Sequence, residues 1–335
     1  MTELITASLT VGQISLPSCL FVNESSGSND TDLDQDRCFI PILVLNSVSL
    51  FVCLFGLAGN GVVLLLLGFW MKKNPFTIYL LNLAIADFGF LLCMVVFLVI
   101  ILLNVPGDIH GGFAAREAIQ WVALFIYNTG LYLLTAISVH RCLSVLFPLW
   151  YRCHRPQNLS PTVCALLWAL SVLVTGLECY FCITRDNCSK MTIFSCVLSF
   201  LVFSPLMVLS SVTLFIKVRY CSQRHQPTKL YVIIMVTVLF FLVLALPLRV
   251  IVLMALLSHT AIHLLVKNLV ILLPCLNSSI NPFIYFLVGK HGRRQVRESL
   301  KEVFQRIFKE EADPQEKRPT KRAQEPATEK PSEHG

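Results

Sequence analysis

Asn281-Pro282-Phe283-Ile284-Tyr285 closes the last of seven long apolar stretches in this 335-residue chain and leads directly into a basic segment. A proline inside a membrane helix removes one backbone hydrogen bond and leaves a carbonyl that needs another partner. Asn281 and Tyr285 are four residues apart, so both can point from one helix face into a bundle interior. Polar groups at that depth are costly and usually mark a pathway or a switch. The motif therefore predicts a switch in the last membrane span.

The composition places the chain among the membrane proteins. It is 55% hydrophobic and only 14% charged, with a mean hydropathy of +0.69, whereas a soluble domain is about one quarter charged. Seven apolar runs are long enough to cross a bilayer. We expect an all-α membrane protein, a single seven-transmembrane helix bundle over residues 41–288. The runs are residues 41–70, 77–103, 115–147, 161–183, 191–217, 229–257 and 263–288.

The distribution of Lys and Arg predicts the orientation. Residues 71–77, 141–160, 217–229 and 290–309 carry 16 of them, whereas the alternate segments 1–40, 104–117, 184–190 and 258–267 carry 5. The positive-inside rule then places the N-terminus outside and the C-terminus in the cytoplasm of a plasma-membrane protein. The first three of these basic segments contain no Asp or Glu, which predicts binding to anionic inner-leaflet lipids and acidic partners. The alternative is that part of this excess of basic residues only sets the membrane topology and binds no partner.

The segments that flank the bundle differ from it and from each other. Residues 1–40 form an acidic arm with two glycosylation sequons, at Asn23 and Asn29, which suits an extracellular segment. No apolar leader precedes the arm, so we expect the first span to serve as its own anchor. Residues 289–309 have apolar residues at helical spacing between basic ones, typical of an amphipathic helix on the inner leaflet. Residues 310–335 are rich in Pro, Glu and Lys and predict a disordered cytoplasmic tail.

Short motifs mark most of the spans, and two longer stretches are more specific. The motifs are Gly59-Asn60, Asn82-Leu83-Ala84-Ile85-Ala86-Asp87, Arg141, Trp168, Pro205, Pro247 and the Asn281 motif, and the longer stretches are YNTGLYLLTAIS at 127–138 and WYRCHRP at 150–156. The motifs resemble those of the rhodopsin-class G-protein-coupled receptors, and the longer stretches resemble the Mas and Mas-related receptors. The resemblance implies a receptor that binds an extracellular ligand and activates a heterotrimeric G protein.

Asp87 is a carboxylate inside the second span, so it must be paired or neutralised. We expect Asn60 and Asn281 as its polar neighbours, with waters or a sodium ion beside them. The alternative is a protonated carboxyl satisfied by Asn and Ser groups. The resemblance implies that this cluster rearranges on activation. Gly130 stands where the class often supplies a hydroxyl ligand to sodium, so the sodium ligands near Asp87 are incomplete and we assign no metal site.

Arg141 ends the third span, and the resemblance implies that a preceding acid restrains it until it reaches toward the G protein. Here the preceding residue is His140. A largely neutral imidazole cannot restrain a guanidinium by charge, because histidine titrates near pH 6.5. We therefore hypothesise raised basal signalling, with packing alone as the alternative restraint. The sixth span has no tryptophan one turn before Pro247, where most of the class carries one. Pro247 still permits a hinge in that span.

In the class, a cysteine at the start of the third span forms a disulfide with an outer loop. This chain has Arg116 at that position, so its outer cysteines depart from the class. The resemblance to Mas-like receptors implies a disulfide between Cys182 and Cys188. Pairing of Cys179 with Cys188 is the alternative, and pairing of Cys19 with Cys38 is left open. Cys182 and Cys188 are both expected on the outer, oxidising side of the membrane.

The loop between Cys182 and Cys188 is too short to form a lid, so we expect the bundle to have a wide and shallow outer mouth. The resemblance implies that Glu178, at the outer end of the fourth span, contacts a basic peptide or a small cationic ligand. The alternative is that Glu178 reaches the headgroups or pairs with Arg249 or Arg185. Arg249 itself could bind a ligand carboxylate. The aromatic candidates for lining the mouth are Trp121, Phe125, Tyr127 and Tyr180.

Other protein classes fit the sequence less well. An opsin needs a lysine in the middle of the last span, where Cys275 and its neighbours offer none. A transporter or channel would show repeated halves and more midplane charge. The Ser, His and Asp residues form no catalytic set, so we expect no enzyme, no cofactor and no nucleic-acid partner. A non-signalling scavenger or decoy receptor remains as the alternative function.

Overall fold

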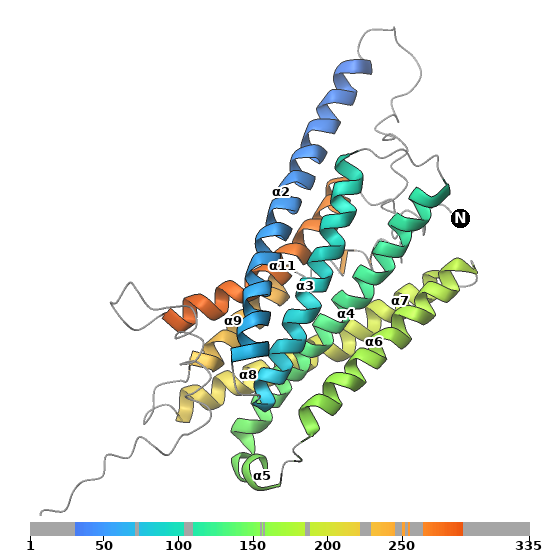
Figure 1. Cartoon of the computed structure of the whole chain (residues 1–335). Coiled ribbons are helices and arrows are strands. Elements are labelled where there is room, and N and C mark those ends of the chain that lie inside the picture. The colour runs from blue at the N-terminus through green and yellow to red at the C-terminus, as the bar shows by residue number, and fades with distance from the viewer. Residues whose placement is uncertain are drawn as a thin grey trace, which may run out of the picture.

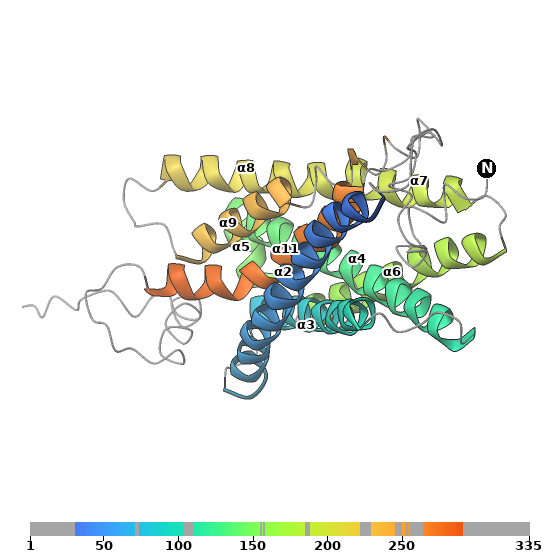
Figure 2. The ribbon, with the colours of Figure 1, turned by 90° about the horizontal axis from the view of Figure 1, so that it is seen from above.

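The computed structural model is a bundle of seven membrane-spanning helical segments, seen from the side in Figure 1 and along a perpendicular direction in Figure 2. The structure describes residues 31–70, 74–103, 110–154, 156, 158–184, 188–221, 229–244, 250–251, 254 and 264–290. A short helix lies between the third and fourth spans. The segments are α2 (Thr31–Leu65) with the π-helix η1 (Leu66–Trp70), α3 (Pro75–Leu102), α4 (His110–Leu146), α5 (Pro148–Cys153), α6 (Leu159–Ile183), α7 (Cys188–Leu198) with the π-helix η2 (Ser199–Phe203) and α8 (Ser204–Cys221), α9 (Lys229–Leu244) and α11 (Leu264–Lys290).

The seven-span prediction is confirmed. Within the described residues, six helices are long and apolar enough to cross a membrane, and the sixth span contributes the shorter apolar helix Met235–Leu244. The first helix begins at Thr31 rather than at residue 41. A helix satisfies its own backbone hydrogen bonds, so it need not begin where the apolar run begins. Helix starts therefore differ from hydropathy boundaries.

The third span is the central one. Helix α4 packs against α3, α6, α8 and α9, and Figure 2 shows it running between its neighbours. In its most apolar window 56% of the residues are buried, the largest share among the spans. Helix α4 therefore lies at the centre of the bundle.

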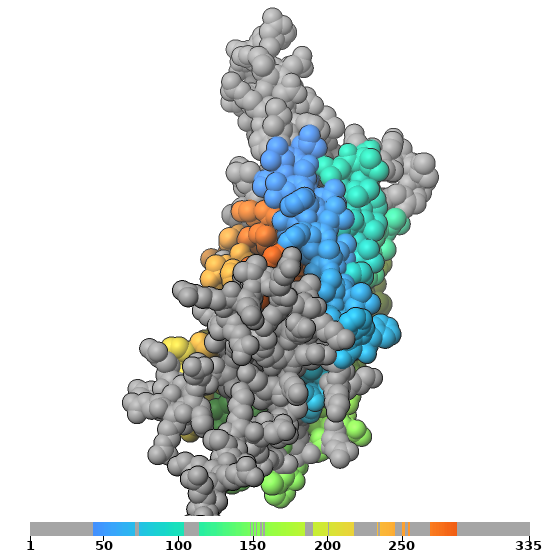
Figure 3. All heavy atoms as spheres, turned by 60° about the vertical axis from the view of Figure 1, so that its left-hand side comes forward, coloured from blue at the N-terminus to red at the C-terminus, as the bar shows by residue number. Residues whose placement is uncertain are grey.

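Helices α2 and α11 pack closely through small residues. A Cβ atom added at Gly56 would collide with Ser279 Oγ and would lie 2.7 Å from Ser279 Cβ, and one added at Gly59 would lie 3.1 Å from Pro282 Cβ. In lipid, helices associate by such close packing and by polar contacts between them. Figure 3 shows atoms of α2 beside those of α11 on the face turned to the viewer. This contact brings Asn60 to the proline motif of α11.

The fifth span contains a π-helical segment. The Ser204 hydroxyl donates to the carbonyl oxygen of Ser199, five residues earlier, at 3.1 Å. The ring of Phe203 in this segment stacks on Tyr132 of α4 with centroids 4.1 Å apart. Single π-turns within helices are rare and often lie at functional sites. Here the turn directs an aromatic side chain against the central helix.

Candidate functional site

The first part of the candidate site is the backbone of α11 at Pro282. Proline has no N–H, so the carbonyl four residues earlier, at Ser278, loses its helical partner. The side-chain amide of Asn60 donates to that carbonyl at 3.1 Å and to the Gly56 carbonyl at 3.0 Å. The sequence predicted Asn60 as a neighbour of Asp87, whereas its amide contacts the backbone of α11. Asn60 thereby joins the first span to the seventh.

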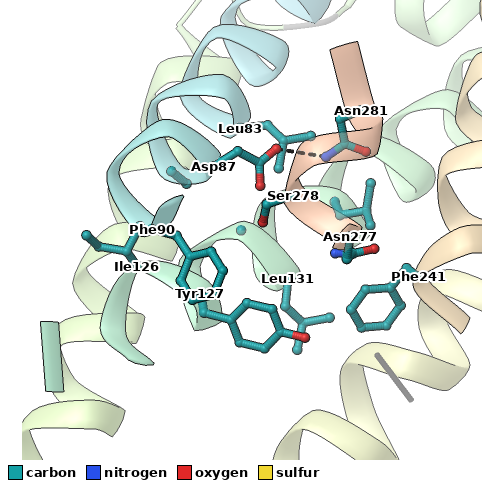
Figure 4. A pocket seen from close by; sticks show the side chains of 13 residues that line it. Leu83, Asp87, Phe90, Ile126, Tyr127, Leu131, Phe241, Asn277, Ser278 and Asn281 are labelled. Atoms are coloured by element: carbon teal, nitrogen blue, oxygen red, sulfur yellow. Dashed lines mark hydrogen bonds between the residues drawn. The ribbon is translucent and has the colours of Figure 1, made fainter. Parts of the chain in front are cut away.

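The second part is the carboxyl group of Asp87, which is only 5% exposed. The Asn281 amide Nδ2 donates to Asp87 Oδ2 at 2.7 Å, as the dashed line in Figure 4 shows. The Ser278 side chain is a second hydrogen-bonding neighbour. The structure therefore places Asn281 against Asp87, as the sequence analysis expected, and adds Ser278. Buried Tyr285 completes this face of α11 one turn later.

A small cavity lies beside the Asp87 cluster between α3, α4, α9 and α11 (Figure 4). The space open to the centre of a water molecule in this cavity is about 10 Å³, which is room for about one water molecule. Among the described residues, Asn281 Oδ1 has no hydrogen-bond partner. The residues that line the cavity are Leu83, Ala86, Asp87, Phe90, Ile126, Tyr127, Gly130, Leu131, Leu134, Phe241, Asn277, Ser278 and Asn281.

The cavity lets us test the fit of a sodium ion. Asp87, Asn277, Ser278 and Asn281 bring oxygen atoms to its wall. Gly130 brings none, and a Cβ atom there would lie 4.0 Å from the Ala86 Cβ. The wall thus has space for a side chain at the position where the resembling class often has a hydroxyl. The oxygen set is therefore incomplete at Gly130, and the cavity wall does not fit a sodium ion.

The C-terminal part of α4 carries two buried basic side chains, His140 and Arg141, which are 7% and 3% exposed. The Tyr151 hydroxyl of α5 shares a hydrogen bond of 3.2 Å with His140 Nε2. The His140 ring also packs against Tyr79 of α3 and against Tyr151, with centroids 5.1 and 5.3 Å apart. The Arg141 guanidinium carbon lies 3.5 Å from the centroid of the Phe76 ring. The sequence analysis missed all three aromatic partners of this pair.

The C-terminal end of α6 carries Glu178, which is 2% exposed. It therefore does not reach out toward the headgroups, one of the alternatives drawn from the sequence. One turn earlier, Thr175 accepts a hydrogen bond of 3.3 Å from the Asn128 amide of α4. Glu117 of α4 and Glu178 both lie close enough to the Cys179 thiol to interact with it through charge. Glu117 is thus a second acid near this end, which the sequence analysis missed.

The predicted aromatic residues of α4 divide between two surroundings. Tyr127 lines the cavity and packs on Phe90, with centroids 5.4 Å apart. The Phe125 ring packs on Trp168 of α6 at 5.6 Å. Trp121 is half-buried, and Tyr180 is 61% exposed at the outer end of α6. A direct role of these side chains in ligand binding stays a prediction.

Several predicted positions lie partly or wholly outside the described residues. Cys182 is disulfide-bonded and Cys179 is free. The side chain of Cys188 is not among those described, so its pairing with Cys182 stays a prediction. The remaining predicted positions outside the described residues are Asn23, Asn29, Pro247, Arg249, Arg185 and the segment 291–335.

Comparisons with known proteins agree on one family. Residues 59–285 match the 7 transmembrane receptor (rhodopsin family). The chain is 45% identical to Proto-oncogene Mas from Mus musculus over 281 residues, which cover 82% of this chain and 86% of that relative. It is 43% identical to Mas-related G-protein coupled receptor member D from Macaca fascicularis, with 86% and 93% covered. For Mas-related G-protein coupled receptor member H from Rattus norvegicus the identity is 47%, with 79% and 83% covered.

The family match includes Asn60, Asp87, Arg141 and Asn281, and the comparisons agree with the resemblance found in the sequence. The chain therefore belongs to the rhodopsin family of G-protein-coupled receptors, which are membrane receptors rather than enzymes, and within that family to the Mas and Mas-related receptors.

Proposed function

We propose that this receptor lies in the plasma membrane with its N-terminus outside, binds an extracellular basic peptide or small cationic ligand, and activates a heterotrimeric G protein. The observation that carries the proposal is Glu178, a carboxylate 2% exposed at the outer end of α6. A carboxylate in surroundings of low dielectric constant interacts strongly with a cation that comes close to it. In this proposal a cationic group of the ligand makes that interaction.

A bound cation at Glu178 has a physical route to the cytoplasm through the central helix. Near Glu178, the Asn128 amide of α4 hydrogen bonds to Thr175 of α6. The same helix lines the Asp87 cavity at Gly130 and carries Arg141 in its last two turns. A ligand that binds one arrangement of these helices more tightly shifts the population toward it. In this proposal Arg141, the loop 148–156 and the basic ends of the fifth and sixth spans receive the G protein.

The residue before Arg141 sets the basal activity in this proposal. An acid at that position would form a charged hydrogen bond with the guanidinium, whereas His140 contacts two tyrosine rings. Because an aromatic contact restrains arginine less than a buried charge pair, we expect ligand-free signalling above that of a variant with an acid. His140→Glu should lower basal output. His140→Gln, which has the shape of glutamate without its charge, is the matched control and should not lower it.

The inner surface of the receptor completes the proposal. The basic residues of segments 71–77, 141–160, 217–229 and 290–309 would lie against anionic inner-leaflet lipids and attract the acidic surface of a partner. The segment 289–309 would rest on the membrane as an amphipathic helix.

The first experiment is a G-protein dissociation panel in cells that express the receptor, with and without short cationic peptides and amines. Glu178→Gln removes the proposed anchor, and Glu117→Gln removes a charge from the neighbouring acid of α4 as the matched control. Loss of the response in the first variant alone supports the anchor. Equal reductions in both variants would indicate general attraction of cations to the outer surface and would contradict the assignment to Glu178.

A non-signalling decoy receptor is the competing function, and the relatives named above give it no support. The same panel separates the two functions. Ligand binding at verified surface expression, with no response from any G protein, would contradict the signalling proposal and favour the decoy.

A further inference from the structure

We propose that the ring of Phe76 is the positioning group for Arg141 in the resting receptor, taking the place of the missing acid. Phe76, Tyr79 and Tyr151 form what we term the aromatic clasp around the end of α4. The inference rests on the proposed function, because positioning of Arg141 matters for signalling only in a receptor that couples to a G protein.

The geometry of the clasp follows from helical spacing. Phe76 and Tyr79 are three residues apart in the first turns of α3, so they share a face of that helix. Phe76 lies under Arg141, with the guanidinium carbon 3.5 Å from the ring centroid. Tyr79 packs on His140, the preceding residue of α4. Two neighbouring rings of α3 therefore contact two consecutive side chains of α4.

Burial and charge explain why a ring is needed. Arg141 is 3% exposed and Phe76 is 1% exposed, so the guanidinium lies away from the cytoplasm where a G protein would meet it. The segments 71–77, 141–160 and 217–229 contain no Asp or Glu, so none of the three can supply a carboxylate. Arginine stacks on aromatic faces and is more weakly hydrated than lysine. The face of Phe76 therefore stabilises the retracted position of Arg141 by a cation–π contact.

Tyr151 completes the aromatic clasp from α5 by its contact with His140. The Tyr151 hydroxyl is 3.2 Å from His140 Nε2, which joins α5 to the end of α4. A flat imidazole packs between the rings of Tyr79 and Tyr151, whereas a flexible charged glutamate side chain would not fill that space in the same way. His140 is thus more than the absence of an acid, because it holds the loop helix beside the retracted Arg141.

The test replaces Phe76 by phenylalanines that carry one, two or three ring fluorines. Fluorination weakens the negative face of the ring in steps and changes its volume little. We expect basal G-protein activation to rise in steps, by about 2- to 30-fold over the series, the ratio that the usual range of cation–π contacts implies. The same series at Phe97, which is 2% exposed in the same helix, is the control and should cause no graded change.

A second readout needs no G protein. The thermal stability of the purified receptor should fall stepwise with fluorination of Phe76 in the parent chain, but not in an Arg141→Met background. Equal behaviour of the two backgrounds would overturn the inference, whatever the signalling result. A stepwise loss confined to the parent chain, in a receptor that activates no G protein, would support the contact between Phe76 and Arg141 and refute only the proposed function.

Conventional variants check the same point. Phe76→Leu keeps an apolar side chain without a π face and should raise basal output, whereas Phe76→Trp offers a stronger face and should keep it at or below the parent level. A rise of the same size in both variants, at equal surface expression, would contradict the role of the ring face and indicate a packing role alone.

Discussion

Replacing Gly56 by alanine should destabilise the receptor through the contact between α2 and α11. The added Cβ atom would collide with Ser279 Oγ, and it would lie 2.7 Å from Ser279 Cβ and 2.8 Å from Leu91 Cδ1. The end of the leucine side chain can move, but the Ser279 Cβ cannot move without the backbone of α11. To avoid the collision the serine hydroxyl must also leave the Val52 carbonyl, to which it donates at 3.1 Å.

The expected loss can be estimated from these contacts. Overpacking of this kind costs about 1–3 kcal/mol, and the lost hydrogen bond adds about 1 kcal/mol. The better helix propensity of alanine returns up to about 1 kcal/mol. The net expectation is a destabilisation of about 1–3 kcal/mol. Gly176→Ala is the control, because a Cβ atom there meets nothing within 4 Å, and it should leave stability unchanged or slightly raised.

The assay is thermal unfolding of the purified receptor followed by a thiol-reactive fluorophore. Cys53 and Cys275 are free and 0% exposed, so they become reactive only when helices separate, once the more accessible Cys93, Cys153 and Cys179 have been replaced by serine. Gly56→Ala should lower the transition temperature, and a second change, Ser279→Gly, should recover part of the loss because it removes both clashing atoms. A Gly56→Ala receptor as stable as the Gly176→Ala control would refute the close packing of α2 and α11.

Three further variants test the polar contacts. Asn60→Leu leaves the Ser278 carbonyl without its side-chain donor and should lower the free energy of unfolding by about 1–3 kcal/mol, measured in the same thermal assay. Gly130→Ser adds the absent hydroxyl to the cavity wall, so sodium chloride should raise the transition temperature of this variant relative to N-methylglucamine chloride, with no such rise in the parent. Tyr151→Phe removes the hydrogen bond to His140 and should raise basal G-protein activation by about 2- to 10-fold; an unchanged basal level at equal expression would contradict that role of the loop.

The sequence allowed the seven spans to be predicted, because hydropathy measures what the hydrocarbon requires of each segment. It did not predict where α2 begins, since a helix can extend beyond the apolar run, as it does from Thr31. The π-helical turn at Ser199–Phe203 was also missed. A change of one residue in hydrogen-bond register leaves hydropathy unaltered.

The candidate site was predicted in part. Asp87 and Asn281 were expected to meet because one is a buried acid and the other a polar residue on the inner face of α11. The hydrogen bond from Asn60 to the Ser278 carbonyl and the cation–π contact of Arg141 with Phe76 were not expected. Both depend on how two helices approach each other, and an apolar phenylalanine in an apolar span gives no sign in the sequence that it faces a cation.

The two amide contacts of α11 determine how much more tightly an agonist must bind the signalling arrangement than the resting one. Asn60 holds the Ser278 carbonyl from α2, and Asn281 holds the Asp87 carboxyl on α3, so α11 is bonded to both neighbours. If the signalling arrangement turns α11 away from them, the two bonds cost about 1–3 kcal/mol together. A full agonist must then bind that arrangement about 5- to 150-fold more tightly than the resting one. A ligand with a smaller preference would be a partial agonist, however high its affinity.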